Sequence, residues 1–178
     1  MMSLAEVNAM AAPDFIACFS DVAEHAPWVA ERAQTRRPFV SVEAIIAAFQ
    51  AVIRQAPEAE RLRLIRAHPD LAGRAAIAGN LAEASRKEQA GAGLDRLTPE
   101  EFARFTDLNS RYRSRFGIPF IFAVKGATLH QILTSFAERL GNDPETEHAT
   151  ALDQVCHIVG FRIADQVSPQ PPGSLPCA

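Results

Sequence analysis

The sequence places a histidine at a predicted helix end and a group of uncharged and acidic polar side chains on a later helix. His68 stands before Pro69, and the residue before a proline is biased away from helical torsions, so a helix should end there. Ser85, Glu88 and Gln89 are spaced i, i+3 and i+4, which puts them on one helix face. Polar groups on a face that should pack into a core are costly unless something needs them. These residues therefore indicate a site that is built on helices.

His68 is suited to general acid–base chemistry because imidazole titrates near neutral pH. A single histidine is more often structural than catalytic, but a helix end and the turn after it commonly face a cleft. Asp70 could orient the imidazole ring or cap the following turn, and capping is the commoner use of an aspartate in such a place.

Glu88 is predicted to face the interior rather than solvent. It shares a stripe with Leu81 and Ala92, whereas Arg86 and Lys87 point elsewhere on the same helix. One carboxylate on a helix is usually a solvated surface group. A half-buried carboxylate beside a histidine, however, forms an acid–base pair, and we expect that arrangement here.

Arg162 lies where the apolar stripe of the last predicted helix should continue. The stripe advances by 3, 4 and 3 residues through Leu152, Val155, Val159 and Arg162. A buried guanidinium stays charged and needs an anion. That anion could be an internal aspartate or glutamate, or it could be a substrate carboxylate or a developing oxyanion.

Composition and charge fit an ordinary globular protein. The chain has 178 residues, 48% of them hydrophobic and 22% charged, so one domain with a substantial core is the default. The net charge of −3 argues against nucleic acid as a partner. No apolar run is long enough to span a membrane and the first residues lack a secretory pattern, so we expect a cytoplasmic protein.

Neither the cysteines nor the other histidines have the spacing of a metal site. The cysteines are widely separated, at Cys18, Cys156 and Cys177. No H-x-x-x-H or H-E-x-x-H spacing links His25, His130, His148 and His157. We therefore expect no disulfide framework, no structural zinc and no catalytic metal.

Helix start and stop signals recur along the whole chain. They predict helices over residues 3–10, 42–55, 57–67, 80–90, 98–117, 128–140 and 143–167, with shorter helices opening at residues 13 and 27. The expected fold is an all-α, single-domain helical bundle over residues 1–167. Residues 168–178 are rich in proline and poor in core residues, so we expect a disordered tail.

Residues 118–124 are the exception to the helical pattern. This apolar run is bounded by Gly117 and Gly126, and it could be a buried strand or a buried extended segment. No second strand is evident to pair with it. Its backbone N–H and C=O groups would need other partners, and a ligand is one possibility.

Four motifs in order resemble those of the OHCU decarboxylase family, whose substrate is 2-oxo-4-hydroxy-4-carboxy-5-ureidoimidazoline (OHCU). They are His68-Pro69-Asp70-Leu71-Ala72-Gly73, Ser85-x-x-Glu88-Gln89 with Ala92-Gly93-Leu94, Asn109-x-x-Tyr112-x-x-x-Phe116-Gly117-x-Pro119-Phe120, and a last helix with Arg162. Each motif alone is weak, but their order over roughly residues 4–167 is specific. No motif position departs from the family pattern.

The resemblance implies an all-α enzyme that needs no cofactor and converts OHCU to (S)-allantoin and carbon dioxide in purine catabolism. It implies His68, Glu88 and Arg162 as the catalytic set. The substrate-binding shell that it implies consists of Pro69, Ser85, Arg86, Lys87, Glu88, Gln89, Phe120, Ile121, Phe122, Ala123 and Val124. It also suggests a homodimer and, as a pathway neighbour, 5-hydroxyisourate hydrolase.

Two other functions compete with this interpretation. One is hydrolysis of a related ureide with His68 as the base, a reaction that usually requires a metal to activate water. The other is a helical binding module that holds a ligand without turnover. A module that only binds need not keep a proton-transfer pair, so the joint presence of His68, Glu88 and Arg162 argues against it.

Overall fold

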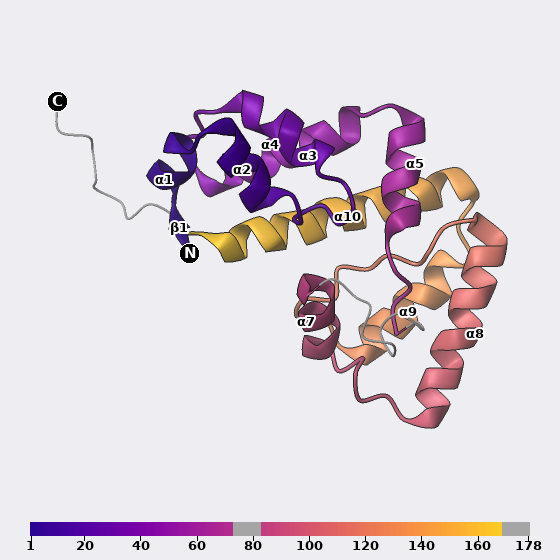
Figure 1. Cartoon of the computed structure of the whole chain (residues 1–178). Helices are drawn as coiled ribbons and strands as arrows, with labels where there is room; N and C mark the ends of the chain where they lie inside the picture. The colour runs from indigo at the N-terminus through magenta and orange to yellow at the C-terminus, as the bar shows by residue number, and fades with distance from the viewer. Residues whose placement is uncertain (73–82, 169–178) are drawn as a thin grey trace. The chain divides into compact units, whose positions relative to one another are not determined.

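The computed structural model describes residues 1–72 and 83–168, and helices make up most of this part of the chain (Figure 1). The all-α prediction is confirmed. One small addition is a parallel pair of two-residue strands, β1 (Met2–Ser3) and β2 (Val167–Ser168). Strands this short leave no periodic pattern in a sequence. Ser168, which the sequence assigns to the tail, pairs with Ser3.

The chain divides into two compact units. The first unit comprises Met1–Ala56 and the stretch from Ile158 onward, and the second unit comprises Pro57–His157. The helix α10 (Pro144–Gln166) contributes its first part to the second unit and its last part to the first. The assignment of residues 1–167 to one domain stays a prediction, and residues 169–178 lie outside the described residues.

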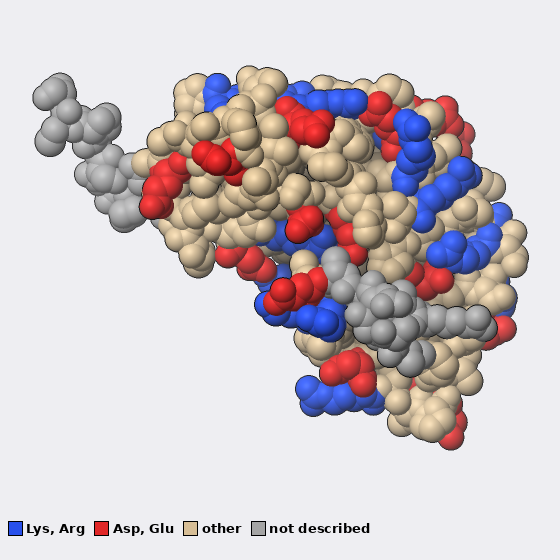
Figure 2. All heavy atoms as spheres, in the orientation of Figure 1, with Lys and Arg blue, Asp and Glu red and all other residues tan. Residues whose placement is uncertain are grey.

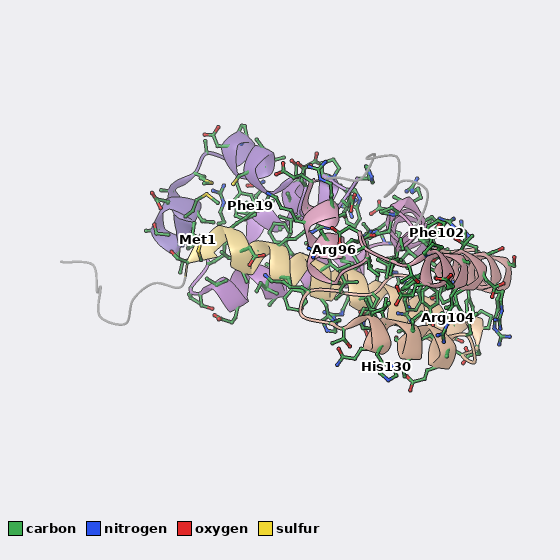
Figure 3. All side chains as sticks on the ribbon, turned by 90° about the horizontal axis from the view of Figure 1, so that it is seen from below. Met1, Phe19, Arg96, Phe102, Arg104 and His130 are labelled. Carbon is green, nitrogen blue, oxygen red and sulfur yellow. The ribbon has the colours of Figure 1, made fainter. Side chains whose placement is uncertain are left out.

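The first unit is built around phenylalanine side chains. Its other elements are α1 (Leu4–Ala9), α2 (Ala12–Phe19), α3 (Trp28–Ala33), the 3-10 helix η1 (Gln34–Arg36) and α4 (Val42–Gln55). Ser41 caps α4, as predicted, by accepting a hydrogen bond from the Ala44 N–H. The ring of Phe19, labelled in Figure 3, lies 4.7 Å from that of Phe15 and 5.8 Å from that of Phe49 between centroids. These rings join α2 to α4.

The second unit is built around α8 and α9. Its elements before α10 are α5 (Glu58–Ala67), α7 (Glu83–Gly91), α8 (Pro99–Phe116) and α9 (Leu129–Arg139). A capping box starts α8, with Thr98 and Glu101 exchanging hydrogen bonds as the sequence predicts. The two helices pack through aromatic rings, with Tyr112 and Phe136 edge to face at 6.0 Å between ring centroids. The helix predicted over residues 80–90 corresponds to α7, and its first residues lie outside the described part.

Residues 118–124 join α8 to α9 without forming a helix or a strand. Gly117 ends α8 with a φ of 68°, a left-handed conformation that glycine adopts at no steric cost. The rings of Phe120 and Phe122 stack nearly in parallel at 6.2 Å, close to the i to i+2 repeat of an extended chain, about 6.7 Å. The prediction of a buried extended segment is confirmed, and the alternative of a paired strand is wrong.

Candidate functional site

His68 is buried at the C-terminal end of α5, where Pro69 ends the helix as predicted. Its backbone N–H donates to the Ile65 carbonyl at 3.2 Å, and its Nδ1 lies 3.0 Å from the Leu64 carbonyl oxygen. A carbonyl only accepts, so Nδ1 must carry the proton in this hydrogen bond. The lone pair of the neutral ring then sits on Nε2. The last turn of α5 thus fixes the ring and makes Nε2 its basic atom.

The short loop after His68 is held by side chains of α7 and α8. The Ala72 N–H donates to Gln89 Oε1 at 3.1 Å, and Asn109 Nδ2 donates to the Leu71 carbonyl at 2.8 Å. Ala72 has a φ of 49°, a left-handed conformation that a non-glycine residue keeps only when its surroundings impose it. The side chains at the Gln89 and Asn109 motif positions therefore both fix the loop that carries His68.

Asp70 pairs with an arginine of another helix. Its carboxylate accepts from Arg113 Nε of α8, at 2.9 and 3.1 Å to the two oxygens. The contact is part-exposed and ties the loop to α8, and the turn that Asp70 is predicted to cap continues outside the described residues. A sequence-local rule misses this partner because Arg113 comes from a different helix.

The predicted inward face of α7 is present in the structure. Ser85, Gln89 and Ala92 are buried, while Arg86 and Lys87 are exposed. Leu81, the other residue of the predicted stripe, lies outside the described residues.

Glu88 is half-buried on α7, which is the degree of burial that the sequence predicts for it. Its place in a catalytic pair with His68 stays a prediction.

A cavity of about 820 Å³ opens beside α7. Its lining residues are Ala72, Arg86, Lys87, Gln89, Ala90, Leu94, Asp95, Leu97, Pro99 and Phe102. Three residues of the predicted substrate-binding shell, Arg86, Lys87 and Gln89, are among them. Phe102, labelled in Figure 3, adds an aromatic wall from the first turns of α8. The volume is in the range of small-molecule sites.

Arg162 is buried in the first unit, as its position in the stripe predicts. Its Nη2 lies 3.7 Å from the Glu24 carboxylate, and its Nη1 donates to the carbonyls of Asp21 and Val22 at 3.4 Å. The Glu24 side chain is also buried, with 4% of its surface exposed. Of the two anions left open by the sequence, the structure supplies the internal glutamate.

A buried polar cluster, formed by Tyr112, Arg139, Asn142 and Glu147, lies next to the extended segment. Arg139 Nε donates to Glu147 Oε1 at 2.8 Å, the Tyr112 hydroxyl donates to the same oxygen, and Asn142 Nδ2 donates to Glu147 Oε2 at 2.7 Å. Arg139 Nη1 also donates to the Ile121 carbonyl at 2.6 Å. Burial raises the pKa of Tyr112, so its hydroxyl stays protonated as a donor. The cluster links the segment to α8, α9 and α10.

Tyr112→Phe should destabilise the protein by about 1–2 kcal/mol, because it removes one donor from the buried Glu147 carboxylate while Arg139 and Asn142 keep theirs. Urea unfolding of both proteins measures the difference. A Tyr112→Phe protein as stable as the parent would mean that the hydroxyl adds nothing to the cluster.

The sequence contains a signal for Arg139 like the one for Arg162. The buried stripe of α9 advances by 4 and 3 residues through Ile132, Phe136 and Arg139. Glu24 offers no such signal, because it lies in a turn between α2 and α3 and has no expected partner until the fold brings Arg162 to it.

The remaining predicted shell residues are spread over a range of burial. Phe120, Ile121 and Val124 are buried, and Pro69, Phe122 and Ala123 are half-buried.

In the described part of the chain, no group of three His, Cys, Asp or Glu side chains could hold a metal ion. The helices there include none that is apolar and long enough for a membrane span. Lys and Arg side chains and Asp and Glu side chains are scattered in separate groups over the face in Figure 2, with larger uncharged areas between them.

Comparison with known proteins identifies the family. A family model described as OHCU decarboxylase matches residues 8–164. The chain belongs to the OHCU decarboxylase family. Among members of that family, the 2-oxo-4-hydroxy-4-carboxy-5-ureidoimidazoline decarboxylase of Haloferax volcanii is 39% identical, over 94% of this chain and 97% of its own length. The resemblance inferred from the motifs is confirmed.

Two further relatives of this OHCU decarboxylase family member are longer proteins. A uric acid degradation bifunctional protein of Bacillus sp. is 36% identical over 93% of this chain, which spans 32% of that protein. A crystal structure of an (S)-allantoin synthase matches with a TM-score of 0.76 and 26% identity, over 94% of this chain and 54% of that one. The fold therefore also occurs as one part of larger chains.

Proposed function

We propose that this protein decarboxylates OHCU to (S)-allantoin and carbon dioxide in urate degradation, acting as a carbon–carbon lyase. The observation that carries the proposal is the match to the OHCU decarboxylase family over residues 8–164. The positions of the buried His68 and of the Gln89 and Asn109 side chains that fix its loop support it.

The reaction explains the residue types. When the bond to the carboxylate breaks, its electron pair stays on the ring carbon and is delocalised into the adjacent imine as an enolate-like species. A proton must then be delivered to the ring, and delivery from one face gives one enantiomer. The site must therefore stabilise negative charge as it develops and hold a proton donor in place.

His68 is the proposed proton-transfer residue. Nδ1 is engaged with the Leu64 carbonyl, so Nε2 would act on the substrate hydroxyl next to the departing carboxylate and then deliver the proton. Glu88 would orient the imidazole or bind the ureido N–H groups together with Gln89. The other proposed shell residues are Pro69, Ser85–Lys87 and 120–124.

Arg162 is the proposed anion-binding residue. Only an interaction that strengthens as charge develops lowers the barrier, so a role at the oxyanion would contribute more to the rate than a role at the ground-state carboxylate. Its contact with Glu24 at 3.7 Å is longer than a hydrogen bond. The proposal adds the substrate anion as a further partner of this guanidinium.

The test is turnover of freshly generated OHCU by the purified protein. Circular dichroism of the allantoin formed reports both the rate of its formation and its configuration. We expect (S)-allantoin to form faster than in the spontaneous reaction. A protein that binds OHCU or allantoin without accelerating the reaction would instead be the binding module considered above.

Chelator treatment should leave turnover unchanged, because the described residues offer no ligand set for a metal. The measurement is the rate before and after dialysis against a chelator, with zinc added back. Loss of activity that zinc restores would favour the alternative hydrolase, in which a metal activates water.

We also propose, from the family resemblance, that the protein acts as a cytoplasmic homodimer without a cofactor. The preceding step would be catalysed by 5-hydroxyisourate hydrolase, and the bifunctional relative agrees with a neighbouring activity in urate degradation. Size-exclusion chromatography with light scattering tests the dimer.

A further inference from the structure

The extended segment, residues 118–124, is held at two backbone groups by side chains from other helices of the second unit. Arg139 Nη1, at the end of α9, donates to the Ile121 carbonyl at 2.6 Å. Gln154, in α10, accepts from the Ala123 N–H through its Oε1 at 2.9 Å. Side chains thus make the backbone hydrogen bonds that a neighbouring strand would make in a sheet.

The two anchors lie at the same edge of the segment. In an extended chain, the N–H and C=O groups of alternate residues point to the same edge. Ile121 and Ala123 therefore use one edge, and the N–H and C=O of Phe122 point to the other. Within the described part of the chain, the backbone of Phe122 makes no hydrogen bond. One edge is fixed by side chains, and the Phe122 edge has no hydrogen-bond partner among the described residues.

The two anchors differ in what else they do. Arg139 belongs to the buried polar cluster, and its guanidinium also covers the Phe120 ring at 4.5 Å. Gln154 is half-buried, and its hydrogen bond to Ala123 is the one that the described residues give its side chain. Gln154 can therefore be changed without stranding a buried charge.

We propose that Gln154 is a positioning residue for the substrate-binding segment. By fixing the Ala123 N–H, it sets the direction of the Phe122 N–H and C=O groups, which would meet the paired N–H and C=O groups of a ureide. This inference rests on the proposed function, since it assigns the segment to that substrate. Gln154 itself does not touch the reacting atoms.

Two variants test this role. Gln154→Met keeps the side-chain size and removes the acceptor, and Gln154→Glu keeps an acceptor oxygen. We expect Gln154→Met to raise KM for OHCU and Kd for (S)-allantoin about fivefold, the effect of one hydrogen bond, with kcat nearly unchanged. Gln154→Glu should restore both constants. Faster amide exchange at Ala123 in Gln154→Met alone would report the lost anchor directly.

Several outcomes overturn the proposal. These are an unchanged KM and Kd in Gln154→Met, an equal loss in both variants, and a fall in kcat at constant KM, which is the sign of a smaller folded fraction. A Gln154→Met protein that fails to fold also overturns it, because Gln154 would then serve stability in general. The parent protein's own turnover of OHCU tests the proposed function separately, since that measurement does not involve Gln154.

Discussion

His68→Asn is expected to fold like the parent protein and to turn over OHCU about 10²–10⁴-fold more slowly, the usual contribution of a general acid or base. Asparagine is the informative replacement because its amide can still donate to the Leu64 carbonyl, as His68 Nδ1 does. The hydrogen bond that fixes the side chain is then kept, and the titrating nitrogen is lost. Initial rates followed by circular dichroism, together with thermal unfolding, give both quantities.

His130→Asn is the matched control for this change. His130 is exposed on α9 and labelled in Figure 3, so the same substitution there should leave turnover and stability unchanged. Near-parental turnover by a folded His68→Asn protein would contradict the proposed role of His68 in proton transfer. A large loss in the His130→Asn control would show that the assay responds to something other than the site.

The parts of the site that follow a helical repeat could be predicted from the sequence. The burial of Ser85 and Gln89 on α7, and of Arg162 on α10, follows from one period and a few apolar neighbours. The end of α5 at His68 follows from the torsions that proline imposes on the residue before it. These rules are local, because each depends on the geometry of a single helix and not on how the helices pack together.

The partners of these residues could not be predicted in the same way. The pairing of Asp70 with Arg113 and that of Gln154 with the Ala123 N–H join elements that are far apart in the sequence. No period or cap connects them, because the contact exists only once the helices have packed. The sequence predicts that the backbone of the extended segment needs hydrogen-bond partners other than a strand. It does not predict that side chains of Arg139 and Gln154 supply them.

Arg162→Leu should cost about 3–5 kcal/mol of stability, because it leaves the buried Glu24 carboxylate without its guanidinium. The sequence alone leaves open a second result, a stable but inactive protein, which would hold if the guanidinium faced a pocket without an internal partner. With Glu24 in place, loss of activity in this variant does not separate a role in catalysis from a role in folding. Chemical unfolding measures the cost, and a protein as stable as the parent would contradict the ion pair.

Replacing both members of the pair makes the separation. In the variant with Arg162→Leu and Glu24→Leu, neither member of this pair is left buried and charged without the other, so most of the lost stability should return, since a buried ion pair is often matched by well-packed apolar residues. A deficit of about 1–2 kcal/mol should remain, because the Asp21 and Val22 carbonyls lose their donor. If Arg162 binds the developing oxyanion, the double variant stays inactive although its stability has been largely regained. If Arg162 only holds the first unit together, turnover returns with stability, and the proposed anion-binding role is wrong.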